Sequence, residues 1–340
     1  MTAWFSGSAD FAVDLGTVNT CVLAKSQGVL VREPSLVAFD RTRAHVEAVG
    51  REARDLLGRM PDDVVAVKPM RDGVIADTDA VEHMLNHIIR KAHSRAAWRR
   101  RRMIVGIPSA ITPVDRRAVC ETIQKVDAKE VYLVQEPVAA AIGAGIDVLE
   151  PRANMVVDIG GGTTDVAVVC GGYVLYSASE KVGGNAMDEA IAHHMRRKHG
   201  LAIGEQTAEQ IKIEIGSALP LDAPETMEVR GYGLTSGAPK IAMVSDAEIR
   251  DALNDSIRRV MDTMVQALGD LPAEVSSDVF ERGLILTGGG SLLRNLGLRV
   301  RIATQLPVQI AEDPLSSVVV GAGQMFEREE LLRRLSTQAA

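Results

Sequence analysis

The sequence is poor in the residues that mark several classes of protein. Aromatic residues make up 3% of it, and its three cysteines are Cys21, Cys120 and Cys170. These cysteines form no C-x-x-C pair and have no spacing suited to zinc, so we expect three reduced thiols. No run of about 18 apolar residues occurs, so we expect no membrane-spanning helix. Residues 1–10 have neither the basic nor the apolar segment of a signal peptide, so secretion is not expected.

Length and charge indicate a globular, acidic protein. A chain of 340 residues is long enough for about two domains. Hydrophobic residues at 46% and charged residues at 24% are typical of a folded chain. The net charge of −7 argues against a nucleic-acid partner. Only residues 90–102 depart from this acidic character, because they include many basic residues and no acidic one.

One pattern occurs twice. Residues 11–24 and 155–169 each contain a short apolar segment that ends in an aspartate, a turn of glycine and threonine, and a second apolar segment. Such segments are typical of β-strands, and their repetition suggests two related halves that face each other. Predicted helices alternate with strands along the rest of the chain, which indicates the α/β class. Residues 245–268 are expected to form one long helix, continuous or interrupted.

Both turns contain the groups that bind a polyphosphate. Glycine lets backbone N–H groups approach closely, threonine hydroxyls add donors, and an aspartate can hold magnesium. The candidates are Asp14, Gly16, Thr17, Asn19 and Thr20 in the first turn, and Asp158, Gly160, Gly161, Gly162, Thr163 and Thr164 in the second. Either turn alone could be an ordinary hairpin.

A third glycine turn supports the phosphate interpretation. Gly288, Gly289 and Gly290 follow a predicted strand over residues 284–287, and we expect a helix from Ser291. The sequence has no G-x-x-x-x-G-K-[ST], so it has no P-loop, and no G-x-G-x-x-G that opens a helix. A dinucleotide-binding Rossmann domain is therefore not expected.

These three motifs resemble the phosphate 1, phosphate 2 and adenosine motifs of the actin-like ATPase superfamily, which includes actins, chaperone ATPase domains and sugar kinases. Residues 32–38, 69–77, 135–145 and 283–293 are similar to the bacterial actins of the MreB/Mbl family. The resemblance covers nearly the whole chain. It implies an α/β, actin-like (ribonuclease H-like) fold, with duplicated domains around a nucleotide cleft.

The resemblance also implies domain boundaries. Domain I would comprise residues 1–150 and a returning segment 315–340, with a small inserted subdomain at about 32–67. Domain II would comprise residues 151–314, with a small inserted subdomain at about 218–244.

The resemblance implies ATP and magnesium as cofactors. Glu136 would orient or deprotonate the attacking water, Thr163 would help to position it, and Asp14 and Asp158 would bind magnesium through waters. Base and ribose contacts would come from Gly183, Gly184, Glu209, Lys212, Gly288, Gly289 and Gly290. Taken alone, Glu136 could be an acid favoured at a helix N-terminus, and Glu209 and Lys212 could be a solvated ion pair. The adenine assignment rests on the resemblance alone, so GTP stays an alternative.

Two segments suggest contact with a membrane. The candidate residues are Trp4, Phe5, Trp98, Arg99, Arg100, Arg101 and Arg102. Tryptophan favours the headgroup level, and basic residues are attracted to an anionic leaflet. In the family that the sequence resembles, both segments lie on the membrane-facing edge of one subdomain. The alternative is a solvated basic turn with a tryptophan packed on the protein.

The resemblance implies a weak ATPase that forms filaments on the inner, cytoplasmic face of the cell membrane. Its partners would be further copies of itself, the anionic membrane surface and membrane proteins of cell-wall synthesis. Its role would be cell shape, or sporulation-type wall assembly. The alternatives are a monomeric chaperone-type ATPase, a sugar or acetate kinase, and a scaffold without hydrolysis. A chaperone would need a substrate domain after the predicted helix 327–335, and a kinase would need a polar acceptor site.

Overall fold

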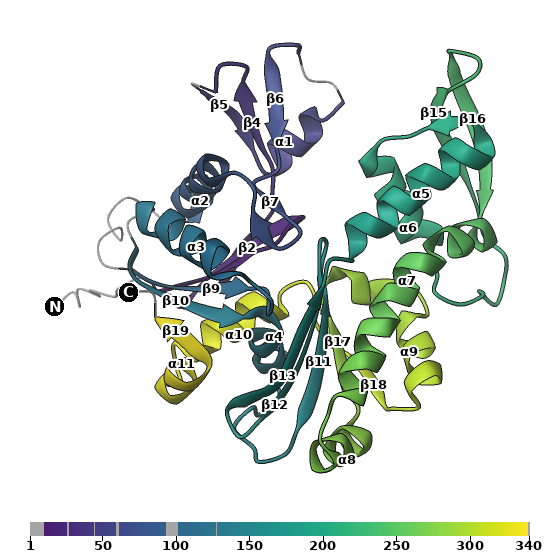
Figure 1. Cartoon of the computed structure of the whole chain (residues 1–340). Coiled ribbons are helices and arrows are strands. Elements are labelled where there is room, and N and C mark those ends of the chain that lie inside the picture. The colour runs from purple at the N-terminus through teal and green to yellow at the C-terminus, as the bar shows by residue number, and fades with distance from the viewer. Residues whose placement is uncertain are drawn as a thin grey trace.

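A computed structural model describes residues 10–25, 27–43, 45–58, 61–92, 101–126 and 128–338. Two mixed sheets form its centre (Figure 1). The first has the order β19 (Ser336–Gln338), β10 (Ala128–Gln135), β9 (Arg101–Ile107), β1 (Phe11–Leu15), β2 (Asn19–Ala24) and β3 (Gly28–Pro34). The second has the order β13 (Tyr173–Glu180), β12 (Thr164–Cys170), β11 (Asn154–Ile159), β17 (Leu284–Thr287) and β18 (Val308–Ile310).

The two sheets share one connectivity. β1, β2 and β3 are antiparallel neighbours, and β9 lies parallel to β1 on its other side. β11, β12 and β13 are likewise antiparallel, and β17 lies parallel to β11. The predicted repeat is therefore present in the fold, and the α/β class is confirmed.

Two helices fill the space between the sheets. α4 (Glu136–Gly143) packs against α10 (Ser317–Met325), and one apolar cluster joins both helices to strands of both sheets. Glycine permits this close contact, because a Cβ at Gly143 would lie 1.9 Å from the Ser317 carbonyl oxygen. A Cβ at Gly321 would lie 1.8 Å from the Ala139 carbonyl oxygen. The sheets are thus held by helices whose backbones touch.

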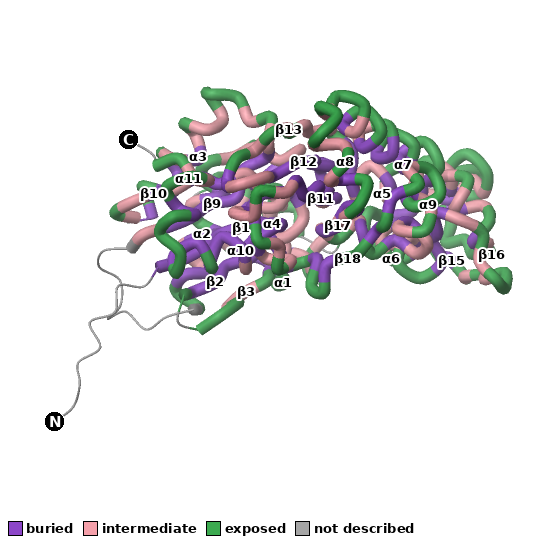
Figure 2. The backbone as a smooth tube through the Cα atoms, turned by 90° about the horizontal axis from the view of Figure 1, so that it is seen from below, coloured by how far each residue is buried: buried purple, intermediate pink, exposed green. Residues whose placement is uncertain are grey.

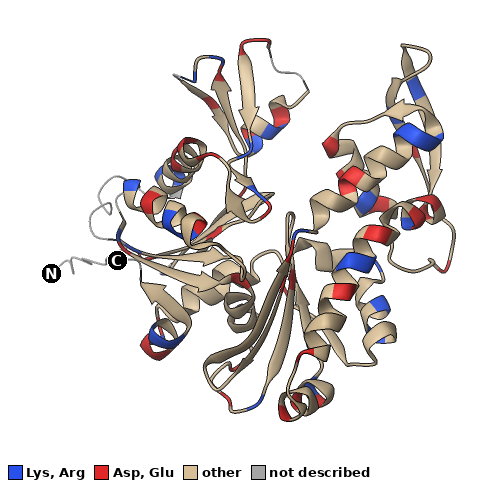
Figure 3. Cartoon of the chain, in the orientation of Figure 1, with Lys and Arg blue, Asp and Glu red and all other residues tan. Residues whose placement is uncertain are grey.

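The other helices cover the outer faces of the sheets. α2 (Thr78–Ala92) and α3 (Pro113–Lys125) pack on the first sheet. On the second sheet pack α5 (Gly184–His199), α7 (Asp246–Gly269), α8 (Ala273–Arg282) and α9 (Leu296–Thr304). α11 (Glu329–Leu335) precedes β19. The central strands are largely buried (Figure 2), and charged side chains gather on the outer helices and on the small sheets described next (Figure 3).

Two small sheets extend from the same side of the molecule (Figure 1). One contains β4 (Val37–Asp40), β5 (Val46–Val49) and β6 (Val64–Val67), beside α1 (Arg51–Leu56). The other contains β14 (Leu201–Ala202), β15 (Thr226–Gly233) and β16 (Pro239–Ser245), beside α6 (Glu205–Ile215). A hairpin of β7 (Met70–Arg71) and β8 (Val74–Ile75) lies between β6 and α2 in the chain. The two small sheets fall at or near the expected insertions, but the domain boundaries stay a proposal.

One predicted helix is confirmed and another is not. The long helix expected over 245–268 is present and uninterrupted as α7, and Ser245 and Glu248 form a reciprocal capping box at its start. The helix expected from Ser291 is wrong. Residues Gly289–Leu292 form only a 3-10 turn, and α9 starts at Leu296, since Asn295 has the left-handed φ of 60°.

Candidate nucleotide-binding cleft

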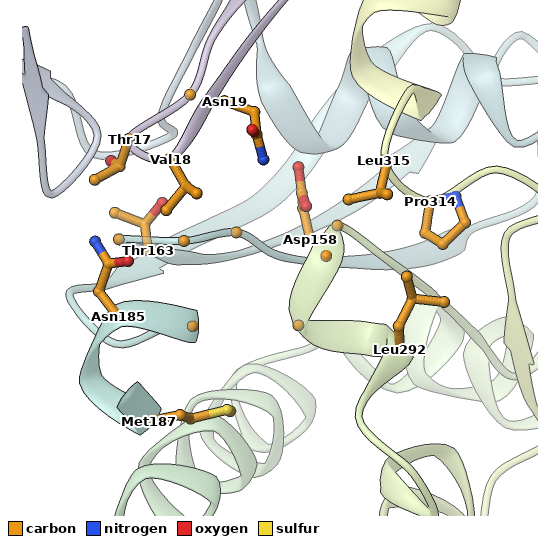
Figure 4. Close-up of a pocket in the computed structure, with 18 of the residues that line it drawn as sticks. Thr17, Val18, Asn19, Asp158, Thr163, Asn185, Met187, Leu292, Pro314 and Leu315 are labelled. Carbon is orange, nitrogen blue, oxygen red and sulfur yellow. The ribbon is translucent and has the colours of Figure 1, made fainter. Parts of the chain in front are cut away.

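A cavity of about 400 Å³ lies where the two sheets face each other. Residues from the β1–β2 turn, the β11–β12 turn, α5, α6 and the turn after β17 line it (Figure 4). The sequence-predicted residues found there are Asp14, Gly16, Thr17, Asn19, Glu136, Asp158, Gly160, Gly161, Gly162, Thr163, Gly184, Glu209, Lys212, Gly288, Gly289 and Gly290. The two halves of the repeat therefore contribute to one cavity.

The β1–β2 and β11–β12 turns touch each other. A Cβ at Gly161 would lie 2.2 Å from Val18 Cγ2, and a Cβ at Gly162 would lie 2.6 Å from Thr17 Oγ1. Thr17 Oγ1 in turn accepts a hydrogen bond of 3.0 Å from the Gly73 amide. Glycine is thus needed at 161 and 162 because the opposite turn occupies the space of a side chain. Because these glycines have no side chain, they line the cavity with backbone alone.

Two predicted phosphate ligands do not reach the cavity. Thr20 is buried and its Oγ1 lies 2.9 Å from Ser35 Oγ, while Thr164 is buried and donates to the Val182 carbonyl over 2.8 Å. Neighbouring residues of a strand point to opposite faces. Asn19 lines the cavity, so Thr20, the next residue of β2, points away from it. Thr163 likewise lines the cavity, and Thr164 points away. The prediction is corrected for these two hydroxyls.

The N-terminus of α5 is fixed to the second turn. The amides of Gly184 and Asn185 donate to the carbonyls of Gly160 and Gly161 over 3.0 and 2.8 Å. Gly183 does not line the cavity, but a Cβ there would lie 2.5 Å from the Gly160 carbonyl oxygen. Gly183 therefore supports the turn by close packing and does not itself face a ligand.

Lys212 connects α6 to α5. Its Nζ donates to Asp188 Oδ2 over 2.9 Å and to the Gly184 carbonyl over 3.2 Å. Burial raises the pKa of Asp188 to about 6, although the Lys212 ammonium opposes this shift. The sequence reasoning missed Asp188, and no motif distinguishes it from Glu189, the other acid of this helix.

Glu209 pairs with a residue from the opposite side of the cleft. Arg54 in α1 binds the Glu209 carboxylate, and the Arg54 carbonyl accepts from Gln206 Nε2 over 2.9 Å. Lys68 after β6 binds Glu205 over 2.5 Å. The alternative of a Glu209–Lys212 ion pair is therefore wrong, because each residue has another partner. These contacts join the two small-sheet regions across the mouth of the cavity, and we call them the cross-cleft clasp.

Three carboxylates, Asp14, Glu136 and Asp158, line the cavity, and a fourth, Asp165, lies near them without lining it. Asp158 and Asp165 are buried, and Asp14 and Glu136 are partly buried. Enclosure by the protein raises the pKa of Asp14 to about 7. The same cause, together with the charges of Asp165, Asp14 and Asp158, raises the pKa of Glu136 well above its usual value. The pKa of Asp158 is also raised well above its usual value, by enclosure and by the charges of Asp14 and Asp165.

This concentration of acids fits a hard cation. Within the described part of the chain, no hydrogen bond or ion pair neutralises Asp14, Glu136 or Asp158. Magnesium prefers carboxylate oxygens and retained waters, and Asp14 and Asp158 offer such oxygens from the two opposed turns. The donor set therefore suits magnesium.

Asp165 is a buried acid to which sequence reasoning gave no role. Burial raises its pKa, although the Ser109 amide donates to Oδ1 over 2.9 Å and side chains of Thr163 and Ser179 also donate to it. The residue directly follows the two threonines of the second turn, so its place in the motif was the available signal. Through Thr163, Asp165 fixes a hydroxyl that lines the same cavity as Glu136.

The glycine turn after β17 makes room for Asp158. Gly288 has a φ of 77°, and a Cβ there would lie 2.2 Å from Asp158 Oδ1. Its amide donates to the Pro314 carbonyl over 3.0 Å. Beyond this turn the cavity is lined by Leu292, Pro314 and Leu315, which form an apolar wall on the side of Asp158 that faces away from the β1–β2 turn (Figure 4). A flat apolar ring and a charged tail would thus find different surroundings.

The predicted membrane residues fall mostly outside the described structure. Trp4, Phe5, Trp98, Arg99 and Arg100 lie outside the described residues, as does the side chain of Arg101. Arg102 is part of β9 and not of a loop.

The Arg102 side chain already has partners. Its Nη2 pairs with Asp10 over 2.5 Å, and its guanidinium lies 5.3 Å from the centre of the Phe326 ring. These contacts fix Arg102 to the protein, which argues against a role in binding lipid headgroups. Within the described residues no helix is both long and apolar enough to span a membrane.

Comparisons with known proteins agree with this geometry. The sequence profile of the MreB/Mbl protein family matches residues 8–334. The cell shape-determining protein MreB of Escherichia coli (strain K12) is 47% identical over 325 residues, which are 94% of each chain. The cell shape-determining protein Mbl of Bacillus subtilis (strain 168) is 41% identical over 329 residues, covering 96% of this chain and 99% of that protein.

Solved structures show the same fold. The crystal structure of MreB5 of Spiroplasma citri bound to AMPPNP has a TM-score of 0.90 and 34% identity, covering 94% of this chain and 96% of that one. A MamK double helical filament has a TM-score of 0.80 at 21% identity, covering 94% and 99%. The fold is therefore actin-like, and the chain belongs to the MreB/Mbl protein family.

Proposed function

We propose that this protein is an ATP-dependent, filament-forming cytoskeletal protein that determines cell shape and lies on the inner face of the cell membrane. The observation that carries the proposal is the cavity in which two opposed glycine turns meet Asp14, Glu136 and Asp158. MreB5 of Spiroplasma citri has been solved with AMPPNP and with ADP, which supports an adenine nucleotide as the ligand. The names of the E. coli and B. subtilis relatives support the role in cell shape.

In this proposal the phosphates lie between the two turns. Amides of residues 16–18 and 160–162 donate to them, and Thr17 and Thr163 hydroxyls add further donors. Asp14 and Asp158 would hold magnesium through waters, and magnesium would offset the phosphate charge when bound. The base lies toward the turn after β17 and the apolar wall formed by Leu292, Pro314 and Leu315.

Hydrolysis would then depend on Glu136 and Thr163. Glu136 begins α4, whose backbone is locked against α10, so its carboxylate has a fixed position. A carboxylate with a raised pKa is a stronger base once it is ionised, and a cation held by Asp14 and Asp158 would favour that ionised form. Thr163 is held by Asp165 and would hold the same water from the other half of the repeat.

Filaments would strengthen weak membrane attachment. Residues around Trp4 and Trp98 would each contribute a small interaction, and many copies in one filament would add these interactions by avidity. The cell-wall synthesis proteins that the family resemblance implies would be recruited along such a filament.

Electron microscopy on an anionic lipid monolayer tests the proposal. We expect lipid-bound filaments with Mg-ATP and none without nucleotide. Asp158→Ala should abolish assembly, because it removes a magnesium ligand. Single particles of the wild type under both conditions would contradict the filament proposal, and normal assembly of Asp158→Ala would show that the nucleotide does not control it.

A further inference from the structure

A second group of potential ligands lies away from the cleft, where the end of α5 meets the start of α7. His194 and His199 belong to α5, and Glu248 belongs to α7. One ligand atom from each of these three residues lies within 4.8 Å of the other two. We propose that His194, His199 and Glu248 bind a divalent transition metal of the zinc class, which ties α5 to α7.

The distances suit such an ion. His199 Nε2 lies 3.4 Å from Glu248 Oε2. Two ligand atoms about 2.1 Å from a tetrahedral zinc ion are separated by about 3.4 Å, so this pair already has the required spacing. His194 completes three ligands after its ligand atom moves by up to about 1.4 Å, the difference between the 4.8 Å bound and this spacing. The fourth position would be taken by water.

The two imidazoles have unsatisfied nitrogens. Nε2 of His194 and Nε2 of His199 are both shielded from solvent and have no hydrogen-bond partner. The His199–Glu248 distance is longer than an ordinary hydrogen bond. Leaving two buried polar atoms unpaired costs free energy, and a bound metal ion would satisfy both.

Burial and nearby charges favour the neutral form of the His194 imidazole, which metal ligation requires. Burial lowers the pKa of His194, and the positive charges of Lys198, His199 and Arg197 act in the same direction, while Glu248 opposes them. Lys240 also reaches this end of α5, where its Nζ donates to the His199 carbonyl over 2.5 Å. A proton on the His194 imidazole would thus meet several cations.

Glu248 is held in its ionised form. Burial alone would raise its pKa, but hydrogen bonds from the Lys198 side chain and the Ser245 amide outweigh burial and lower it. The same contacts fix the carboxylate in place. Lys198 is the group with which a metal ion would compete, since it binds the other carboxylate oxygen.

The ligand types favour zinc over magnesium. Two imidazoles and one carboxylate suit zinc and similar ions, whereas magnesium prefers oxygen ligands only. The site is therefore chemically distinct from the acids of the cleft, and it sits at the far end of the helix that begins at Gly184 (Figure 1).

Metal titration of the full-length protein tests the inference. Protein stripped with EDTA is returned to excess Mg²⁺ and ADP, and Zn²⁺ is titrated against a chromophoric chelator. We expect one Zn²⁺ per chain with a Kd in roughly the micromolar range. His194→Gln and His199→Gln should each weaken binding at least about tenfold. His193→Gln is the matched control, because His193 is the adjacent histidine of the same helix and is exposed.

Co²⁺ provides the second readout. Its visible absorption reports tetrahedral coordination, and thiolate ligands give a separate charge-transfer band. A tetrahedral spectrum without that band in the wild type and in His193→Gln, and its loss in the other two variants, would support the site. Unfolding temperatures in EDTA check that all variants fold. Equal Zn²⁺ affinity in all four proteins, a thiolate band, or no Zn²⁺ binding by the wild type would overturn the inference.

Discussion

Gly288 offers the sharpest test of how the cleft is built. Its φ of 77° lies in the left-handed region, and a Cβ there would lie 2.2 Å from Asp158 Oδ1 and 2.4 Å from the Ile159 carbonyl oxygen. The substitution Gly288→Ala therefore has two costs. One is backbone strain, and the other is displacement of the Asp158 carboxylate from the cavity.

A second glycine separates these costs. Gly145 follows α4 with a φ of 84°, and no atom lies within 4 Å of the position of its Cβ. Gly145→Ala should thus lower the free energy of unfolding by the backbone term alone, about 1–2 kcal/mol. Gly288→Ala adds crowding of about 1–3 kcal/mol, for a total of about 2–5 kcal/mol.

The assays are denaturant unfolding and nucleotide binding. Gly288→Ala should bind Mg-ATP at least about tenfold more weakly, which corresponds to about 1.4 kcal/mol, because Asp158 is displaced. Gly145→Ala should bind it as the wild type does. The reasoning is refuted if the two variants lose equal stability and retain equal affinity.

Three further predictions concern the carboxylates and the clasp. Glu136→Gln should slow phosphate release in single-turnover assays by about 10²-fold or more while ATP affinity stays unchanged; unchanged hydrolysis would remove Glu136 from the reaction. Arg54→Met should speed release of a fluorescent ATP analogue about 1.4- to fivefold, since a partly exposed ion pair contributes about 0.2–1 kcal/mol. Lys68→Met, which removes a more exposed pair, should change the rate less, and the reverse order would contradict the clasp. Because the pKa of Asp14 is raised from 3.8 to about 7, the metal-free native state holds a proton that the unfolded state releases, so stability in EDTA should fall as pH rises from about 4 to 7, by up to about 4 kcal/mol. Denaturant unfolding should show a smaller fall in Asp14→Asn, and an equal fall would assign the effect to other groups.

The sequence was informative where one residue type has one structural use. Gly161 and Gly162 were recognised as phosphate-turn residues, and the structure shows that the opposite turn fills the space of any side chain there. The repeat of aspartate, glycine and threonine also predicted that both halves would meet. Local chemistry was thus enough to find the cavity.

Other features depend on long-range packing and could not be predicted. Nothing near Arg54 or Glu209 in the sequence indicates that they pair across the cleft, because the pairing depends on how two inserted regions lean toward each other. The helix predicted from Ser291 is absent because Asn295 adopts a left-handed conformation, and α9 starts only after it. By contrast, strand alternation alone could have shown that Thr20 points away from Asn19.

The clasp and the acids together determine how closure depends on a ligand. The ion pairs of Arg54 and Lys68 are partly exposed, so each contributes at most about 1 kcal/mol. Repulsion between Asp14 and Asp158, which lie on the two opposed turns, acts against these ion pairs. The charge of Asp14 raises the pKa of Asp158, which shows that the two carboxylates are close enough to repel. Below its raised pKa of about 7 Asp14 can hold a proton in place of a cation, but above that pH contacts of this size oppose the repulsion between the two acids only weakly. Closure in the proposed function must therefore come from the cation and phosphates that both turns bind, so loss of the γ-phosphate would weaken it.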